Sequence, residues 1–95
     1  MEPTMKLLMM EIAYVNEMLA AAASGCVASR ELSRIYLNRL FAPKLKVLGE
    51  KCRIGRKYHP LFETIALHGN FDREHIRRCQ QHLLGLRDEL NIKYS

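Results

Sequence analysis

Two stripes of apolar side chains, one near each end of the chain, constrain the fold most strongly. In the first stripe, apolar residues recur three and four positions apart, at Met5, Leu8, Ile12, Val15, Leu19 and Ala22. The second stripe has the same spacing, at Ile76, Cys79, Leu83, Leu86 and Leu90. Such heptad-like seams predict two long amphipathic helices, each of which needs a long partner. They are expected to pair within one chain or across a dimer.

The residues that flank the two seams predict where these helices begin and end. Thr4 is placed to cap the first helix, and Ser24-Gly25 is placed to end it. Asp72 is placed to cap the last helix. Phe71 before this cap and Ile76 after it have the spacing of a hydrophobic staple. The predicted helices are therefore 5–23 and 72–91.

The middle of the chain is predicted in three parts. A helix over 29–41 is expected to end at Pro43, because proline lacks a backbone donor and restricts the residue before it. The inner face of this helix is predicted to be Leu32, Ile35, Tyr36 and Leu40. Residues 43–59 fit either a short hairpin that turns near Gly49 or a ragged helix followed by a loop. A further helix, opened by Pro60, is predicted over 60–67.

Composition supports one globular domain over residues 1–95. The chain is 48% hydrophobic and 26% charged, and it lacks tryptophan, which favours an aliphatic helical core. We therefore predict a mainly α fold: a compact bundle of about four helices with a basic irregular or short hairpin segment between the second and third. Three cysteines are too few for a disulfide scaffold and indicate an intracellular protein, cytoplasmic or nuclear. The longest uncharged run, 18–29, is too short to span a membrane.

Positive charge is concentrated in the second half of the chain. Up to Pro43, four basic residues balance four acidic ones, whereas from Lys44 onward eleven basic residues face six acidic ones. This excess carries the whole net charge of +5. It indicates either an acidic partner, which would be nucleic acid or an acidic protein face, or a solvated surface. The candidate binding residues are Lys51, Arg53, Arg56, Lys57, Arg73, Arg77 and Arg78.

The junction between the last two predicted helices fits two structures. Ala66, Gly69-Asn70 and Ile76 have the spacing of a helix-turn-helix DNA reader, in which Arg73, Arg77 and Arg78 would face outward. The same spacing also fits an ordinary helical hairpin. Glu74 would oppose phosphate on the outward face, so the hairpin is favoured.

Signals for catalysis or metal binding are weak. There is no glycine-rich phosphate loop, and Cys52 has basic neighbours that would lower its pKa but no general base nearby in the sequence. His75, Cys79 and His82 share one helical face. They fit a metal site less well than a core cysteine flanked by amphipathic histidines. We predict no catalytic residue, no metal and no cofactor.

The middle segment resembles one known family. Cys52, Ile54-Gly55, Lys57, Pro60, Glu63, Ile65-Ala66 and Gly69 are similar to the middle of the BTG/Tob antiproliferative domain. The resemblance covers this segment, and the tryptophan boxes of the family's partner-binding surface are absent. It implies a non-catalytic adaptor that binds the deadenylase that shortens mRNA poly(A) tails.

Together these features predict a small non-enzymatic adaptor or regulator that binds another protein through helical and basic surfaces. The alternative is a helix-turn-helix DNA-binding transcriptional regulator that uses helix 72–91. Two seams in one short chain also predict a homodimer. No association with a membrane is expected.

Overall fold

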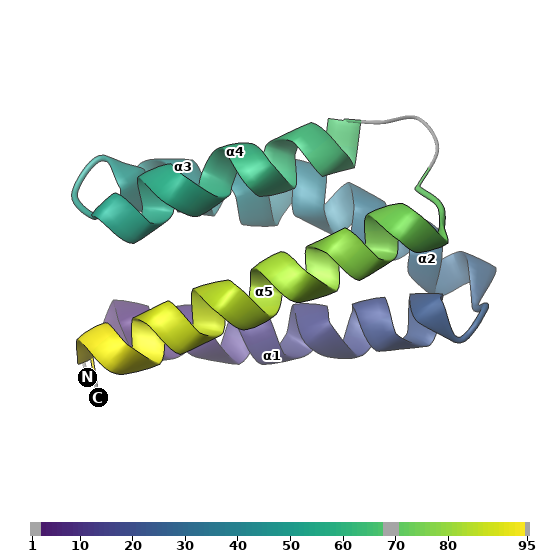
Figure 1. The fold of residues 1–95 in the computed structure, drawn as a ribbon, viewed down its shortest axis with the longest axis horizontal. Helices are drawn as coiled ribbons and strands as arrows, with labels where there is room; N and C mark the ends of the chain where they lie inside the picture. The colour runs from purple at the N-terminus through teal and green to yellow at the C-terminus, as the bar shows by residue number, and fades with distance from the viewer. Residues whose placement is uncertain (1–2, 68–70, 95) are drawn as a thin grey trace.

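The computed structural model describes residues 3–67 and 71–94, and nearly all of them are helical. The elements are α1 (Pro3–Ala23), α2 (Val27–Tyr36), the π-helical turn η1 (Leu37–Phe41), α3 (Ala42–Gly49), α4 (Arg53–Leu67) and α5 (Arg73–Tyr94). Because α2, η1 and α3 follow one another without a break, they form one bent rod. The described part is thus a bundle of four rods, which confirms the predicted mainly α fold (Figure 1).

The rods are closely packed around most of the bundle. α1 lies against α2 and α5, α5 lies against α4, and α4 lies against η1 and α3. Figure 1 shows α1 and α5 as one layer and α3 and α4 as the other. Among the described residues, α1 and α3 do not form a close packing of this kind. The bundle is therefore open on the side between these two helices.

The two predicted seams meet inside the chain. On α1, Ile12, Val15 and Leu19 are buried, and on α5 the seam from Ile76 to Leu90 is buried throughout. Because α1 and α5 pack on each other, the intrachain pairing accounts for both stripes except at Leu8, which is only half-buried. The core continues between the other rods, where the rings of Phe41 and Phe62 meet edge to face, with centroids 5.2 Å apart.

The ends of the first and last helices agree with the sequence in part. Asp72 caps α5, because its Oδ1 accepts the backbone N–H of His75 at 3.1 Å, and Phe71 and Ile76 are both buried as a staple requires. α1 ends where predicted, at a turn in which Gly25 has a φ of +98°. Thr4, however, lies within the first turn of α1 and is not its cap.

The segment 43–59 is helical except for its turn. α3 and α4 occupy most of it, and a three-residue turn at 50–52 joins them. Pro43 does not end a helix but lies in the first turn of α3. The widened turn before it makes this possible: Ala42 N–H donates to Leu37 O, five residues back. Pro60 likewise lies inside α4, which begins at Arg53.

The buried face of α2 differs from the prediction. Leu32, Ile35 and Leu40 are exposed, whereas Ser33 and Leu37 are buried. Ser33 is polar and was not among the residues predicted for the inner face. Its hydroxyl donates to the carbonyl of Ser29 at 2.6 Å, so burying it leaves no unpaired donor. The buried face of α2 and η1 therefore lies about one residue around the helix from the predicted face.

α3 and α4 approach each other closely through two glycines. A Cβ atom added to Gly55 would lie 2.7 Å from the carbonyl oxygen of Leu45 and would also collide with the backbone of Gly49. Arg56 Nη1 donates to Gly49 O at 2.8 Å, which satisfies a carbonyl at the end of α3. These contacts hold α3 against α4, away from α1.

Candidate functional site

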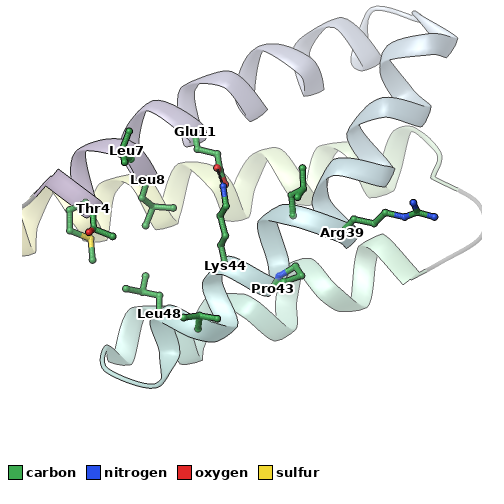
Figure 2. A pocket seen from close by; sticks show the side chains of 11 residues that line it. Thr4, Leu7, Leu8, Glu11, Arg39, Pro43, Lys44 and Leu48 are labelled. Atoms are coloured by element: carbon green, nitrogen blue, oxygen red, sulfur yellow. Dashed lines mark hydrogen bonds and ion pairs between the residues drawn. The ribbon is translucent and has the colours of Figure 1, made fainter.

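A groove of about 570 Å³ lies between α1 and the η1–α3 part of the bent rod (Figure 2). The α1 wall presents Thr4, Met5, Leu7, Leu8 and Glu11. The facing wall presents Leu40, Pro43, Val47 and Leu48, together with Arg39 and Lys44. Most of the lining side chains are therefore apolar, and the charged ones are Glu11, Arg39 and Lys44.

The course of the bent rod explains why the groove opens. α2 packs on α1, but η1 interrupts the regular helix immediately before Pro43. Beyond this point α3 packs on α4 and η1 instead of α1. π-helical turns of this kind often mark functional positions in helices. The turn therefore separates a closed α1–α2 contact from an open α1–α3 groove.

The groove exposes large apolar side chains that a folded chain would otherwise cover. Leu7 is 67% exposed, Val47 64% and Leu40 48%. All three line the same groove. Contiguous apolar surface with a polar rim is typical of interaction sites, whereas single exposed apolar residues are not. The sequence did not predict this site, because Leu40 was assigned to the inner face of its helix and 43–59 fitted either a short hairpin or a ragged helix followed by a loop.

An ion pair crosses the groove. Lys44 Nζ from α3 donates to Glu11 Oε2 from α1, and Figure 2 shows the two side chains meeting between the walls. The Glu11 side chain is only 12% exposed, and its Oε1 accepts no hydrogen bond within the described part. Burial, with the nearby Glu11 charge, raises the pKa of Tyr36 to about 12. Arg39, on the α3 side, is in no ion pair among the described residues.

The basic residues predicted as a binding site fall into two separate groups. Lys51, Arg53, Arg56 and Lys57 lie at or near the start of α4. Arg73, Arg77 and Arg78 lie at the start of α5, beyond the far end of α4. Since α4 has 15 residues, the groups are separated by roughly 20 Å along the bundle. None of these seven side chains lines the groove.

Three of these basic residues, Arg56, Lys57 and Arg78, have partners among the described residues, and Arg56 donates to Gly49 O as described above. Lys57 donates to Glu89 Oε2 at 2.9 Å, and Arg78 lies 3.6 Å from Glu74. The seven residues do not form one continuous surface, because the α4–α5 pair holds the two groups apart.

α4 and α5 form an antiparallel hairpin whose contacts run from the middle of α4 to the end remote from the turn. The rings of Phe62 and His82 lie 6.1 Å apart near the middle. Tyr58 donates to Glu89 farther along, and Lys93 Nζ lies 3.4 Å from the sulfur of Cys52 at the end. Helices of a helix-turn-helix cross at roughly 90–120° and meet mainly near their turn. The contacts along α4 and α5 instead fit the ordinary hairpin. Gly69-Asn70 and the Ala66 side chain lie outside the described residues.

The buried cysteines lie in the core or at a helix start, and the cysteines and histidines were also considered as metal ligands. Cys79 is fully buried in the α5 seam, and burial raises its pKa to about 12. Burial would also raise the pKa of Cys52, but the N–H groups of Ile54 and Gly55, with Lys93, lower it below its ordinary value. Sequence reasoning had assigned this lowering to neighbouring basic side chains. Among the described residues, no three His, Cys, Asp or Glu side chains are grouped to hold a metal ion.

Comparisons with known proteins give no relative for this chain. No family model, no curated protein and no solved structure matches it. The similarity of the middle segment to the BTG/Tob domain therefore stays a prediction. Within the residues that the structure describes, no helix has the length and apolar character needed to cross a membrane.

Proposed function

We propose that the protein is a small non-enzymatic adaptor or regulator that binds an amphipathic helix of another protein in the α1–α3 groove. The observation that carries this proposal is the spacing of side chains on the two walls. Each wall is a helix that turns an apolar stripe toward the same unfilled space. A third helix is the structure that packs on two such stripes.

The stripes have helical spacing over about two turns. On α1 the lining positions are 4, 5, 7, 8 and 11, and on the facing wall they include 40, 43, 44, 47 and 48. Intervals of three and four residues create the ridges between which side chains of another helix insert. At 1.5 Å per residue, each wall is roughly 10–12 Å long. A partner helix of two to three turns would therefore fill the groove.

A partner other than a second copy fits the groove best. The net charge of +5 makes two copies repel each other, and the seams of α1 and α5 are already covered within the chain. The two seams therefore no longer indicate a homodimer. Dimerisation stays a prediction that light scattering would test, and a mass near 11.0 kDa would contradict it.

The cysteines fit a partner inside the cell. Cys26, Cys52 and Cys79 are all free thiols. Free thiols are typical of a reduced compartment, the cytoplasm or nucleus. We therefore expect the partner to be an intracellular protein.

Binding of a synthetic helix tests the proposal. The probe is a fluorescent amphipathic peptide of about 16 residues, long enough to populate a helix, with leucines spaced at three and four positions. We expect saturable binding by fluorescence anisotropy. Val47→Lys should weaken binding at least about tenfold, because it places a charge in an apolar contact. The Val47 side chain is already 64% exposed, so the variant should fold normally.

Two controls make the result specific. Ile92→Lys introduces the same charge at a side chain that is 81% exposed and does not line the groove, and it should bind like the wild type. A peptide of the same composition with its leucines scrambled should not bind. Equal binding of both peptides, or an equal effect of both variants, would contradict the proposal.

DNA binding through α5 is the second candidate function. Arg73 and Arg77 are exposed near the start of this helix, where the helix dipole also favours phosphate. Duplex DNA titrated across a salt series separates the candidates. If the protein reads DNA, Arg77→Ala should cost about 1–3 kcal/mol at a preferred site, whereas Lys57→Ala should weaken all sequences alike. As an adaptor, the protein should show no site preference.

A further inference from the structure

We infer that the helix bound in the groove carries acidic residues along the edge that faces α3. This inference rests on the proposed function and names the chemistry of its partner. The two walls differ in charge, although they are similarly apolar. That difference gives a bound helix a preferred composition and a preferred rotation about its own axis.

The α3 side of the groove is basic. Arg39 and Lys44 line it, and Lys46 and Lys51 follow on the same rod and the turn after it. The α1 side contributes one charged lining residue, Glu11, which is already paired with Lys44. Arg39 therefore leaves the lining with a net positive charge. A carboxylate on the bound helix would be attracted to the α3 side and repelled by Glu11 on the α1 side.

The positions of the two lining cations set the spacing of the acidic residues. Arg39 and Lys44 are five residues apart on the rod, which corresponds to about 7 Å along its axis. Carboxylates four residues apart on a helix are about 6 Å apart along the axis and share one face. Figure 2 shows Arg39 extending away from the Glu11–Lys44 pair. Lys44 remains 56% exposed, so a second carboxylate can reach its ammonium group.

Three peptides with the same leucine face but different flanks test this inference. One flank carries two glutamates one turn apart, the second carries glutamines, and the third carries lysines. We expect the acidic peptide to bind most tightly and the basic one least tightly. Arg39→Glu should weaken the acidic peptide and strengthen the basic one, each by roughly 3- to 10-fold. The acidic peptide should also lose affinity as salt rises.

Lys46→Glu is the matched control. It makes the same change in net charge on the same rod, but Lys46 does not line the groove. It should change the affinity of either charged peptide much less than Arg39→Glu does. An equal effect of the two substitutions would show that only the overall charge matters, and it would overturn the inference.

The remaining outcomes separate this inference from the proposed function. Equal binding of the three peptides, still weakened by Val47→Lys, would overturn the acidic preference and leave the helix-binding groove intact. Failure of all three peptides to bind would overturn both. A wild-type dimer that Val47→Lys converts to a monomer would show that a second copy occupies the groove, which also overturns both.

Discussion

The two sides of α1 show how similar apolar patterns lead to different outcomes. On one side, the seam from Ile12 to Leu19 is buried against α5. On the other side, Leu7 faces α3 across an open groove, together with Leu8 at the edge of the seam. Both sides use spacings of three and four residues. The amount of apolar surface therefore does not determine whether a side is closed.

The difference arises from the element that faces α1. α5 is one uninterrupted helix of 22 residues, so it follows α1 over a long distance. The opposing rod contains η1 and Pro43, and its last part is held against α4 by the close contact of Gly49 and Gly55. The closed side stabilises the fold, and the open side is left available for a partner.

The largest expected effect comes from breaking the closed side. Leu83 is 1% exposed in the α5 seam, and Leu83→Ala should reduce the free energy of unfolding by about 2–5 kcal/mol, because it removes buried methyl groups and leaves a cavity. Leu84→Ala is the matched control. The adjacent side chain is half exposed and should change stability by less than about 0.5 kcal/mol. Urea unfolding measures both, and equal values would show that this face is not core.

A methyl group at the α3–α4 contact should have the next largest effect. Gly55→Ala should destabilise the fold by about 1–3 kcal/mol, because the added Cβ meets backbone atoms that cannot turn aside. Gly85→Ala is the comparison. Its Cβ would meet the Tyr58 hydroxyl, 2.8 Å away at the end of a side chain, and alanine gains about 1 kcal/mol of helix propensity.

The two glycine variants are compared by thermal unfolding. The melting temperature should fall clearly for Gly55→Ala and change little for Gly85→Ala. If Gly55→Ala were as stable as the wild type, the close contact would not hold α3 against α4.

A smaller effect on the free energy of unfolding, dependent on pH, is expected from a contact between α4 and α5. Hydrogen bonds from Tyr58, and then from Lys57, hold the pKa of Glu89 below its ordinary value of 4.5. A carboxylate whose pKa is lowered by folding stabilises the folded state above its unfolded pKa, and this contribution is lost as the pH falls through the folded pKa. Glu89→Gln should therefore be less stable than the wild type at neutral pH.

The stability difference between wild type and Glu89→Gln should shrink as the pH falls below about 4.5. Urea unfolding at several pH values measures it. A difference that stays constant to about pH 2 would show that the charge of Glu89 does not contribute.

The sequence predicted the elements whose signals are local. The α5 cap and staple involve Phe71, Asp72 and Ile76, all within one helical turn or so, and the structure confirms them. The seams could also be predicted from the sequence, because each stripe follows a single helix. The sequence does not distinguish a short hairpin from a ragged helix over 43–59, and Pro43 indicates the end of the helix before it. The π-helical turn that lets the helix continue past Pro43 has no simple sequence signature.

The groove was not predictable from the sequence because it depends on how two rods diverge. Leu40 and Val47 have helical spacing, but the sequence alone does not show whether a neighbour covers them. The seven basic residues proposed to bind a partner are exposed, yet the hairpin of α4 and α5 places them in two groups. Charge counted along the chain did not indicate where the charges gather in space.

The most direct test of the account is where a helix binds on the surface. An isotopically labelled protein would be titrated with the acidic amphipathic peptide and followed by NMR. The account predicts that the largest shifts occur at Leu7, Leu40 and Val47, with little change at Leu84 and Ile92, which are exposed but lie outside the groove. Shifts centred on α5, or spread evenly over the molecule, would contradict it.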